Sequence, residues 1–306
     1  MRRAMLFTVI LLLAISSVFA WRSISNGKIL RVGHTDPVAP FSTLFHSSSG
    51  GINFIKLDTS VDGLRALKEG DIDLALVGST AVAIGLAQDQ ESRLIAAPMF
   101  FPKEARLFVR KSKSFKSPAD LTKLKIGVPF ISTVHHQLLS YLSENSIDYR
   151  DVELFDLRPF EAVEAWDAGV IDAAIMWEPM SLKIKPNANE YILSLKVAPS
   201  PSFLGLVVRS EVLVTHRKAI EDFVSSVYGE NKSRNEARVV DLVSKIFDLS
   251  QGKVKSIFKA NSYPERLDAK MRESVLNELV ALQAFLKQIG FQKRVSINPS
   301  KQVDLQ

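Results

Sequence analysis

Short apolar runs alternate with segments of helical period along residues 29–209. Apolar runs are typical of buried strands, and apolar residues that recur every three or four positions are typical of a helix with one buried face. Strands are predicted over 29–33, 52–57, 72–77, 94–99, 107–110, 125–128, 152–157, 171–176, 191–197 and 204–209, and helices over 60–69, 79–88, 133–145 and 161–168. This alternation indicates an α/β fold with largely parallel sheets.

From Thr215 onward the period is helical throughout, and it is clearest at Val275, Leu279, Leu282 and Leu286. The C-terminal part of the chain is therefore predicted to be a series of helices with one apolar face.

Two segments of the chain, 66–77 and 165–176, resemble each other. Ala, Gly, Ile, Asp and Ala recur in them at the same offsets, and each is predicted to be a helix, a glycine stop, an Ile-Asp pair and a strand. We interpret them as one unit used once in each of two similar domains. The alternative is a chance similarity between two ordinary helix–strand turns.

Three predicted strands end in small polar residues or an aromatic residue. In open α/β sheets, ligands bind beyond the carboxyl ends of the strands, and a helix N-terminus at that edge attracts an anion. If the three ends belong to two domains, two helix N-termini face each other across a cleft and form a clamp for a small oxyanion. The residues concerned are Ser79 and Thr80, Ser132 and Thr133, and Trp177 and Glu178.

Each of these roles has a simpler structural alternative. Ser132 is also a natural N-cap for the helix that follows it, which is the usual role of a serine at such a turn. Trp177 is either a core residue or a hydrophobic wall of the cleft, and the loop residue Pro179 beside it favours the wall.

Composition narrows the possible chemistry. The chain has 306 residues, 46% hydrophobic and 24% charged, which suits one large or two ordinary globular domains. It has no cysteine, so disulfides, thiolate nucleophiles, cysteine–zinc sites and a lipid anchor on cysteine are excluded. Residues 1–20 are predicted to be a cleaved secretory signal, with Arg2 and Arg3, an apolar run and a small-residue site ending at Ala20. Without those two arginines the net charge is +4 and scattered, which does not indicate nucleic acid as a partner.

Catalytic and metal motifs are weak in this sequence. His135 and His136 are adjacent, so on a helix they diverge by about 100° and do not share one metal ion. The nucleophile elbow, the phosphate loop and the zinc-protease motif do not occur in the sequence. His34, Asp36 and Glu178 are candidates either for acid–base chemistry in a cleft or for holding the amine of a ligand.

The sequence resembles the taurine-binding proteins of bacterial ABC importers. The resemblance lies in the stretch from Ile126 to Leu139, in Leu157-Arg-Pro159, in Ala165-Trp166 and in the stretch from Gly169 to Pro179, together with Val77-Gly-Ser-Thr80. It extends from about Arg31 to Gly290, and the wider family takes sulfonates, nitrate and pyrimidine precursors.

This resemblance implies a type II periplasmic binding protein with two similar lobes, mixed sheets and a two-segment hinge. Lobe 1 is expected to comprise 29–108 and 209–290 and lobe 2 to comprise 111–204, with crossovers near 108–111 and 204–209. The chain is then expected to be a monomer without a cofactor that binds a small anionic solute and presents it to a membrane permease. Its location is periplasmic or secreted, or the endomembrane lumen or extracellular space in a eukaryote.

The resemblance also locates the departures from a taurine binder. Members of the family carry acids that face the ammonium group of taurine, and this chain has Ala39 and Leu204 at those positions. The anion end of the site is retained in Ser79, Thr80, Ser132 and Thr133, with Trp177 on the aliphatic part, and the other end is left to Asp36, His34 or Glu178. The alternative is an enzyme or a ligand sensor on the same fold, of the thiamine-pyrimidine or menaquinone-precursor type, with His34 or His135 in proton chemistry.

Overall fold

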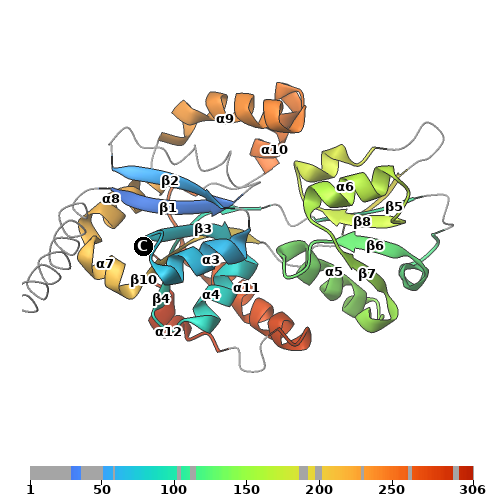
Figure 1. Ribbon diagram of the computed structural model, residues 1–306, viewed down its shortest axis with the longest axis horizontal. Helices are drawn as coiled ribbons and strands as arrows, with labels where there is room; N and C mark the ends of the chain where they lie inside the picture. The colour runs from blue at the N-terminus through green and yellow to red at the C-terminus, as the bar shows by residue number, and fades with distance from the viewer. Residues whose placement is uncertain are drawn as a thin grey trace, which may run out of the picture.

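The computed structural model describes residues 29–35, 51–57, 59–101, 105–110, 115–185, 192–196, 202–228, 231–260, 264–291 and 296–305. They form two five-stranded sheets that lie side by side and are covered by helices, as predicted for an α/β protein (Figure 1). The predicted signal at 1–20, Asp36 and Ala39 lie outside the described residues.

The first sheet has the strand order β2-β1-β3-β10-β4. β1 (Leu30–Thr35) pairs in parallel with β2 (Ile52–Leu57) and with β3 (Leu74–Gly78). β10 (Phe203–Arg209) lies antiparallel between β3 and β4 (Ser92–Phe100). The central strands are continuous apolar runs because helices cover both faces of the sheet.

The second sheet repeats this arrangement with the order β7-β6-β8-β5-β9. β6 (Lys125–Val128) pairs in parallel with β7 (Glu153–Asp156) and with β8 (Ala173–Met176). β5 (Arg106–Arg110) lies antiparallel between β8 and β9 (Ile192–Lys196). Each sheet thus has three parallel strands, then one antiparallel strand, then an edge strand.

The chain crosses twice between the two sheets, and the antiparallel strand of each sheet is the first strand after a crossing. The chain leaves the first sheet after β4 and enters the second at β5, and it returns between β9 and β10. Both passages lie a few residues before the expected crossovers at 108–111 and 204–209, because the segments predicted there are themselves strands of the sheet that the chain enters.

Helices cover the two sheets separately. α3 and α4 pack against the first sheet, α11 packs on α4, and α5 and α6 pack against the second sheet (Figure 1). No helix in the described part of the chain is both long and apolar enough to span a membrane. The helices are α3 (Ser60–Glu69), α4 (Ser79–Gln88), α5 (Thr133–Glu144), α6 (Pro159–Asp167), α7 (Ser210–Thr215), α8 (Arg217–Tyr228), α9 (Asn231–Phe247), α10 (Gln251–Ala260), α11 (Ala269–Gln288) and α12 (Pro299–Gln302), with short 3-10 turns at Pro118–Lys123, Tyr149–Asp151 and Met180–Lys183.

The two copies of the sequence repeat have the same local structure. Gly70 ends α3 with a φ of 82°, and Gly169, with a φ of 72°, follows α6, so each occupies the left-handed conformation that favours glycine. Asp73 accepts a hydrogen bond from the backbone N–H of Arg31 at 2.8 Å, and Asp172 accepts one from that of Lys125 at 3.1 Å. The aspartates therefore tie each repeat to the start of the neighbouring parallel strand.

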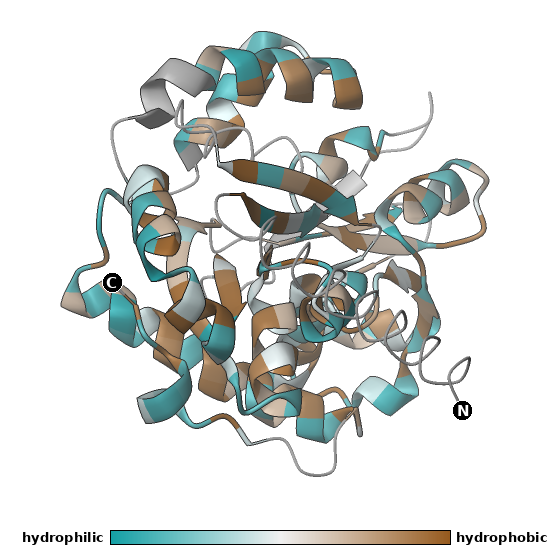
Figure 2. Cartoon of the chain, turned by 60° about the vertical axis from the view of Figure 1, so that its left-hand side comes forward, coloured by the Kyte–Doolittle hydropathy of each residue, from teal (hydrophilic) through white to brown (hydrophobic). Residues whose placement is uncertain are grey.

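Hydrophobic residues are frequent in the strands and recur along the helices (Figure 2), and the buried ones form two clusters. In the second sheet, Ile126 and Val128 of β6 pack with Val134, Leu138 and Leu142, which form the buried stripe of α5. α3 is capped by Thr59, because Thr59 and Asp62 form a capping box.

Candidate functional site

The N-termini of α4 and α5 meet where the two sheets approach each other. α4 follows β3 directly, and α5 follows β6 after the turn 129–132, so both helices begin at the carboxyl edge of a sheet. The hydroxyl oxygens of Thr80 and Thr133 lie 3.3 Å apart and share a hydrogen bond. A Cβ on Gly78 would lie 3.9 Å from the same Thr133 oxygen. The structure therefore brings together one residue from each predicted half of the clamp.

The two helices differ in how their first N–H groups are satisfied. Ser132 caps α5, because its Oγ accepts from the N–H of His135 at 3.2 Å and donates to the carbonyl oxygen of Pro129 at 2.6 Å. The N-cap of α4 is Gly78, which provides no side-chain cap. The first turn of α4 thus begins beside Thr133 without a capping side chain of its own.

His135 holds the turn that precedes α5. Its Nδ1 accepts a hydrogen bond from the N–H of Ile131 at 3.1 Å, and its ring stacks on Phe130 with centroids 4.7 Å apart. Ile131 has a φ of 57°, which is strained for a β-branched residue. The acceptor role of Nδ1 places the ring proton on Nε2.

Both neighbouring histidines are buried and neutral at pH 7. Burial lowers the pKa of His135 to about 4, with His136 acting in the same direction and Asp156 opposing. Burial also lowers the pKa of His136 to about 4. Their rings contact Phe285 of α11, with centroid distances of 5.4 and 5.1 Å. The two histidines are thus packed into the junction between α5 and α11.

Ser79 is fully buried, and its side chain is directed toward α11. Its Oγ donates to Oε1 of Glu278 at 3.4 Å. Glu278 is 2% exposed, and its second oxygen, Oε2, is buried without a hydrogen-bond partner among the described residues. Burial raises the pKa of Glu278 to about 7, although the bond from Ser79 opposes the shift. A buried carboxyl group therefore stands at the N-terminus of α4.

The remaining predicted residues lie at the same sheet edges. His34 is buried near the end of β1, with its ring 6.0 Å from that of Phe54. Trp177 and Glu178 directly follow β8 and are half-buried, and Trp177 packs against the core of the second sheet. Asp36 lies outside the described residues.

Comparison with known proteins identifies the family. The family described as NMT1/THI5 like matches residues 52–228, more than half of the chain. The chain belongs to the NMT1/THI5-like family. This chain is 26% identical over 266 residues to the taurine-binding periplasmic protein of Escherichia coli (strain K12). The alignment covers 83% of this chain and 82% of that protein.

Solved structures share the fold of this NMT1/THI5-like protein. The alkanesulfonate-binding protein SsuA from Xanthomonas axonopodis pv. citri bound to MOPS has a TM-score of 0.68 and 18% identity, covering 90% of this chain and 98% of that one. The Candida albicans CA3427 gene product, which exhibits the generic periplasmic binding protein fold, has a TM-score of 0.57 and 14% identity, covering 90% and 95%. The expected periplasmic binding protein fold is confirmed.

Sequence reasoning missed Glu278 and Phe285 in this NMT1/THI5-like chain. Glu278 stands three residues after Val275 and four before Leu282, so it lies on the apolar face of α11. An acidic residue on an apolar helix face is a signal that could have identified Glu278 from the sequence. Its partner Ser79 is 199 positions away, and the helical period does not reveal such a pairing.

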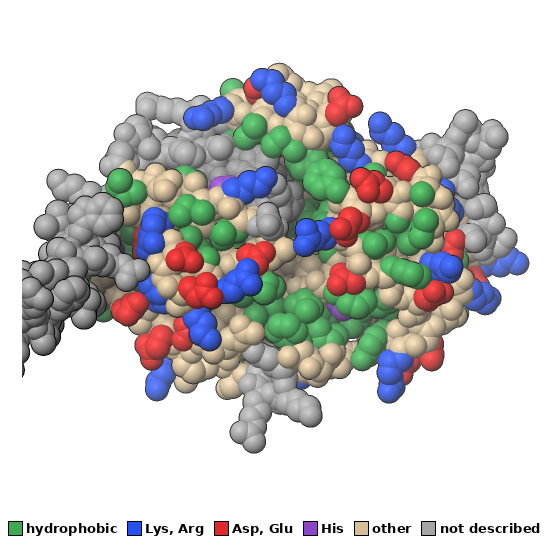
Figure 3. All heavy atoms as spheres, viewed as in Figure 1, with side chains coloured by type: hydrophobic (Ala, Val, Ile, Leu, Met, Phe, Trp, Pro, Cys, Tyr) green, Lys and Arg blue, Asp and Glu red, His purple; other side chains and the backbone are tan. Residues whose placement is uncertain are grey.

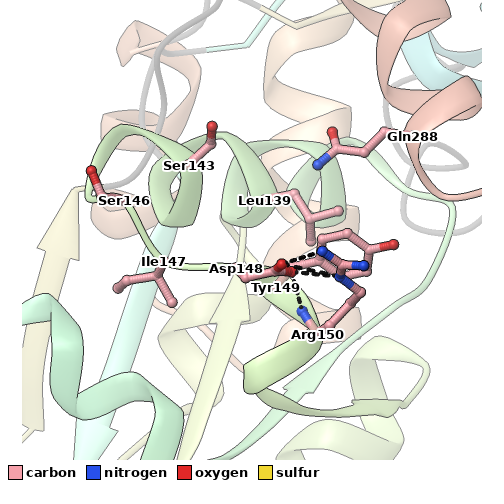
Figure 4. Close-up of a pocket in the computed structure, with 8 residues that line it drawn as sticks. All are labelled: Leu139, Ser143, Ser146, Ile147, Asp148, Tyr149, Arg150 and Gln288. Atoms are coloured by element: carbon pink, nitrogen blue, oxygen red, sulfur yellow. Dashed lines mark hydrogen bonds and ion pairs between the residues drawn. The ribbon is translucent and has the colours of Figure 1, made fainter.

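A separate cavity of about 450 Å³ has a lining that does not include the two threonines (Figure 4). Its lining comes from the later turns of α5, the following loop and the end of α11: Leu139, Ser143, Ser146, Ile147, Asp148, Tyr149, Arg150 and Gln288. Arg150 and Asp148 are paired with each other there. This pairing occupies both charged groups of the cavity, so the cavity is not the predicted anion clamp.

Potential metal ligands do not cluster among the described residues. Within the described ranges, no group of three or more His, Cys, Asp or Glu could hold a metal ion. Figure 3 shows Lys and Arg interspersed with Asp and Glu over the face that it displays.

Proposed function

We propose that this protein is an extracytoplasmic solute-binding protein that captures a small sulfonate-like anion, taurine or a related compound, for an ABC importer. The observation that carries the proposal is the uncapped N-terminus of α4 facing Thr133 at the start of α5. Two helix N-termini concentrate N–H donors and positive dipole ends at one place, which suits an anion without a buried lysine or arginine. The named relatives that bind taurine and alkanesulfonates support the same class of ligand.

In this proposal the anion lies between the starts of α4 and α5. Thr80 and Thr133 contribute hydroxyl groups, and the hydrogen bond between them is exchanged for bonds to the ligand. Ser79 and Ser132 contribute mainly through the backbone, because their hydroxyls contact Glu278 and the Pro129 carbonyl. Trp177 packs on the aliphatic part of the ligand, and His34, Asp36 or Glu178 meets its far end.

The surroundings of α4 favour an aliphatic sulfonate over taurine itself. Leu204 of β10 is fully buried and pairs with Gly78, the residue that caps α4. A leucine at this place offers no partner to an ammonium group, and an unpaired buried ammonium is costly. We therefore expect the amino group of taurine to add little to binding.

Titration calorimetry of the exported chain tests this function. Ethanesulfonate, taurine, nitrate and sulfate are titrated separately, and saturable one-to-one binding of ethanesulfonate is expected, with the Kd of taurine within about tenfold of it. If none of the four anions binds, the proposal is wrong. If taurine binds more than about a hundredfold tighter than ethanesulfonate, an acid supplied by Asp36 or Glu178 faces the ammonium.

Binding rather than turnover is supported by the state of His135. A histidine with a pKa near 4 is a weak base at neutral pH, and its Nδ1 already accepts a backbone hydrogen bond. Recovery of unchanged ligand after long incubation is the expected result. Conversion that is lost in His34→Ala or His135→Ala would establish the enzymatic alternative.

Export is the second part of the proposal. Residues 1–20 are proposed to direct the chain out of the cytoplasm and to be removed after Ala20, since the E. coli relative is periplasmic by name. N-terminal sequencing of the secreted protein is expected to begin at Trp21. A chain that retains Met1 and stays in the cytoplasm would contradict it.

A further inference from the structure

We infer that Glu278 is a positioning residue that takes up a proton from solvent when an anion binds at the N-terminus of α4. The inference rests on the proposed function, since it concerns the same anion site. It follows from where the carboxyl group of Glu278 lies and from what surrounds it.

Glu278 lies at the same helix end as the proposed anion site. Its Oε1 accepts the hydroxyl of Ser79, the first residue of α4, at 3.4 Å. A carboxylate there stabilises the positive end of the helix dipole, as an anionic ligand would. Two negative charges at one helix end repel each other strongly in a buried site. Anion binding is therefore linked to loss of the negative charge on Glu278.

Protonation also changes what Ser79 can do. The ionised carboxylate of Glu278 only accepts, so it holds the Ser79 hydroxyl in the donor role and directs its proton toward α11. When a solvent proton binds Glu278, the carboxylic acid donates a hydrogen bond to Ser79 Oγ. The hydroxyl group of Ser79 keeps its proton and can then donate a hydrogen bond at the start of α4. The acid form thereby adds a donor at the clamp and removes a charge.

Other ionisable groups near α11 do not replace Glu278 in this role. α4, which packs on this stretch of α11, has no ionisable side chain. From α5, His135 and His136 contact Phe285, and burial holds the pKa of each near 4, so neither gains or loses a proton above about pH 6. Burial raises the pKa of Tyr228 of α8 to about 12, although the charge of Arg272 of α11 opposes the shift.

The surroundings set the pH range of the effect. Burial raises the pKa of Glu278 to about 7 in the free protein, and a bound anion raises it further. Affinity is then constant below about pH 7 and weakens by up to tenfold per pH unit above it, until the pKa of the complex is passed.

The test is calorimetric titration of ethanesulfonate from about pH 6 to about pH 9 into wild type, Glu278→Gln and the control Glu273→Gln. Ethanesulfonate is used because it stays fully ionised over this range, unlike taurine. Glu273 is exposed on the same helix, so its variant is expected to match wild type. Glutamine mimics the protonated acid, and the Kd of Glu278→Gln is expected to vary by less than about twofold over the range.

A proton count completes the test without a variant. At about pH 8, titrations in two buffers of different ionisation enthalpy are expected to show uptake of close to one proton per anion by wild type. This measurement decides the matter if Glu278→Gln does not fold, as judged by circular dichroism. Binding with a constant Kd and no proton uptake, or binding that tightens as pH rises, would overturn the inference alone. Absence of binding at every pH would overturn the proposed function with it.

Discussion

The two hydroxyl residues at the start of α5 differ in what their hydroxyls contact. Ser132 Oγ is engaged by the backbone of its own turn, accepting from His135 and donating to Pro129. Thr133 Oγ1 lies 3.3 Å from Thr80 Oγ1 of the other sheet. Two adjacent hydroxyl residues therefore serve local structure in one case and the contact between α4 and α5 in the other.

Substituting each of these residues separates the two roles. Thr133→Val keeps the side-chain shape and removes one hydroxyl, and we expect sulfonate binding to weaken by about 1–2 kcal/mol, roughly five- to thirtyfold. Ser132→Ala removes the cap, and we expect about 1 kcal/mol less stability with affinity changed less than about threefold. Calorimetry and urea unfolding measure the two quantities. Equal losses of affinity in both variants would contradict this assignment.

The buried histidines predict loss of stability in mild acid. Burial lowers the pKa of His136 from 6.5 to about 4, so the unfolded chain binds more protons than the folded one between these values. Stability is then present above about pH 6.5 and is lost as the pH falls toward 4. We expect His136→Gln to reduce the decrease in unfolding free energy between about pH 7 and about pH 5 by about 2 kcal/mol.

The control for this prediction is His216→Gln. His216 lies at the turn between α7 and α8, is only half-buried, and shares a hydrogen bond with Thr215. Urea unfolding at the two pH values is expected to give the wild-type difference in this control. Glu278 contributes with the opposite sign, because its raised pKa makes ionisation above about pH 4.5 destabilising, so only the comparison of variants isolates His136.

At the scale of the elements, the repeated helix–glycine–strand unit depends on backbone conformation. Gly169 has a φ of 72°, and a Cβ placed on it would meet nothing within 4 Å, so its requirement is conformational rather than steric. We expect Gly169→Ala to destabilise the protein by about 1 kcal/mol. Gly252→Ala in α10, also with open space around it, is expected to stabilise by up to about 1 kcal/mol. Chemical denaturation measures both, and the same sign for both variants would refute the argument.

Periodicity predicted the elements because it reflects local burial, and the glycine stops made the repeat visible. The α/β class, the strands at both carboxyl edges and the helix starts at Ser79 and Thr133 follow from such local signals. Long-range pairings do not, because period and propensity describe one segment at a time. The contact between Ser79 and Glu278 and the insertion of β10 between β3 and β4 depend on packing of distant segments.

The direction of each side chain at the site also could not be predicted from the sequence. Adjacent helical residues diverge by about 100°, so a Ser-Thr pair at a helix start sends its two hydroxyls to different partners. In α4 these partners are Glu278 for Ser79 and Thr133 for Thr80. The sequence identified the residue types at the strand ends, and the folded neighbours decide which hydroxyl faces the other sheet.

At the scale of the whole molecule, α5 and α6 of the second sheet contact helices from the C-terminal part of the chain. Phe285 of α11 packs against His135 and His136, and Phe247 of α9 stacks on Phe160 of α6, with centroids 6.3 Å apart. Together with the Thr80–Thr133 bond, these contacts hold the two sheets near each other at separate points. A ligand between the starts of α4 and α5 would therefore be enclosed by both sheets.

A cysteine pair at the two threonines tests this closeness in solution. The chain has no cysteine, so Thr80→Cys/Thr133→Cys carries only two thiols. Because the Thr80 and Thr133 hydroxyl oxygens are 3.3 Å apart, we expect mild oxidation to join the cysteines and thiol titration to find neither thiol free. The bond should abolish ethanesulfonate binding by fixing the sheets together across the site, and a reductant should restore binding only to the weaker level expected without the two threonine hydroxyls.

The matched control for the cysteine pair is Thr80→Cys/Ser143→Cys. Ser143 is exposed on α5, ten residues after Thr133 and therefore about 15 Å further along the helix. Both thiols of this control are expected to stay free under the same oxidation, because that separation far exceeds the reach of a disulfide. If the thiols at 80 and 133 also stay free, the two helix starts are apart in solution. If they join while binding is unaffected, the anion site is not between them, since a covalent bond there leaves no room for a ligand.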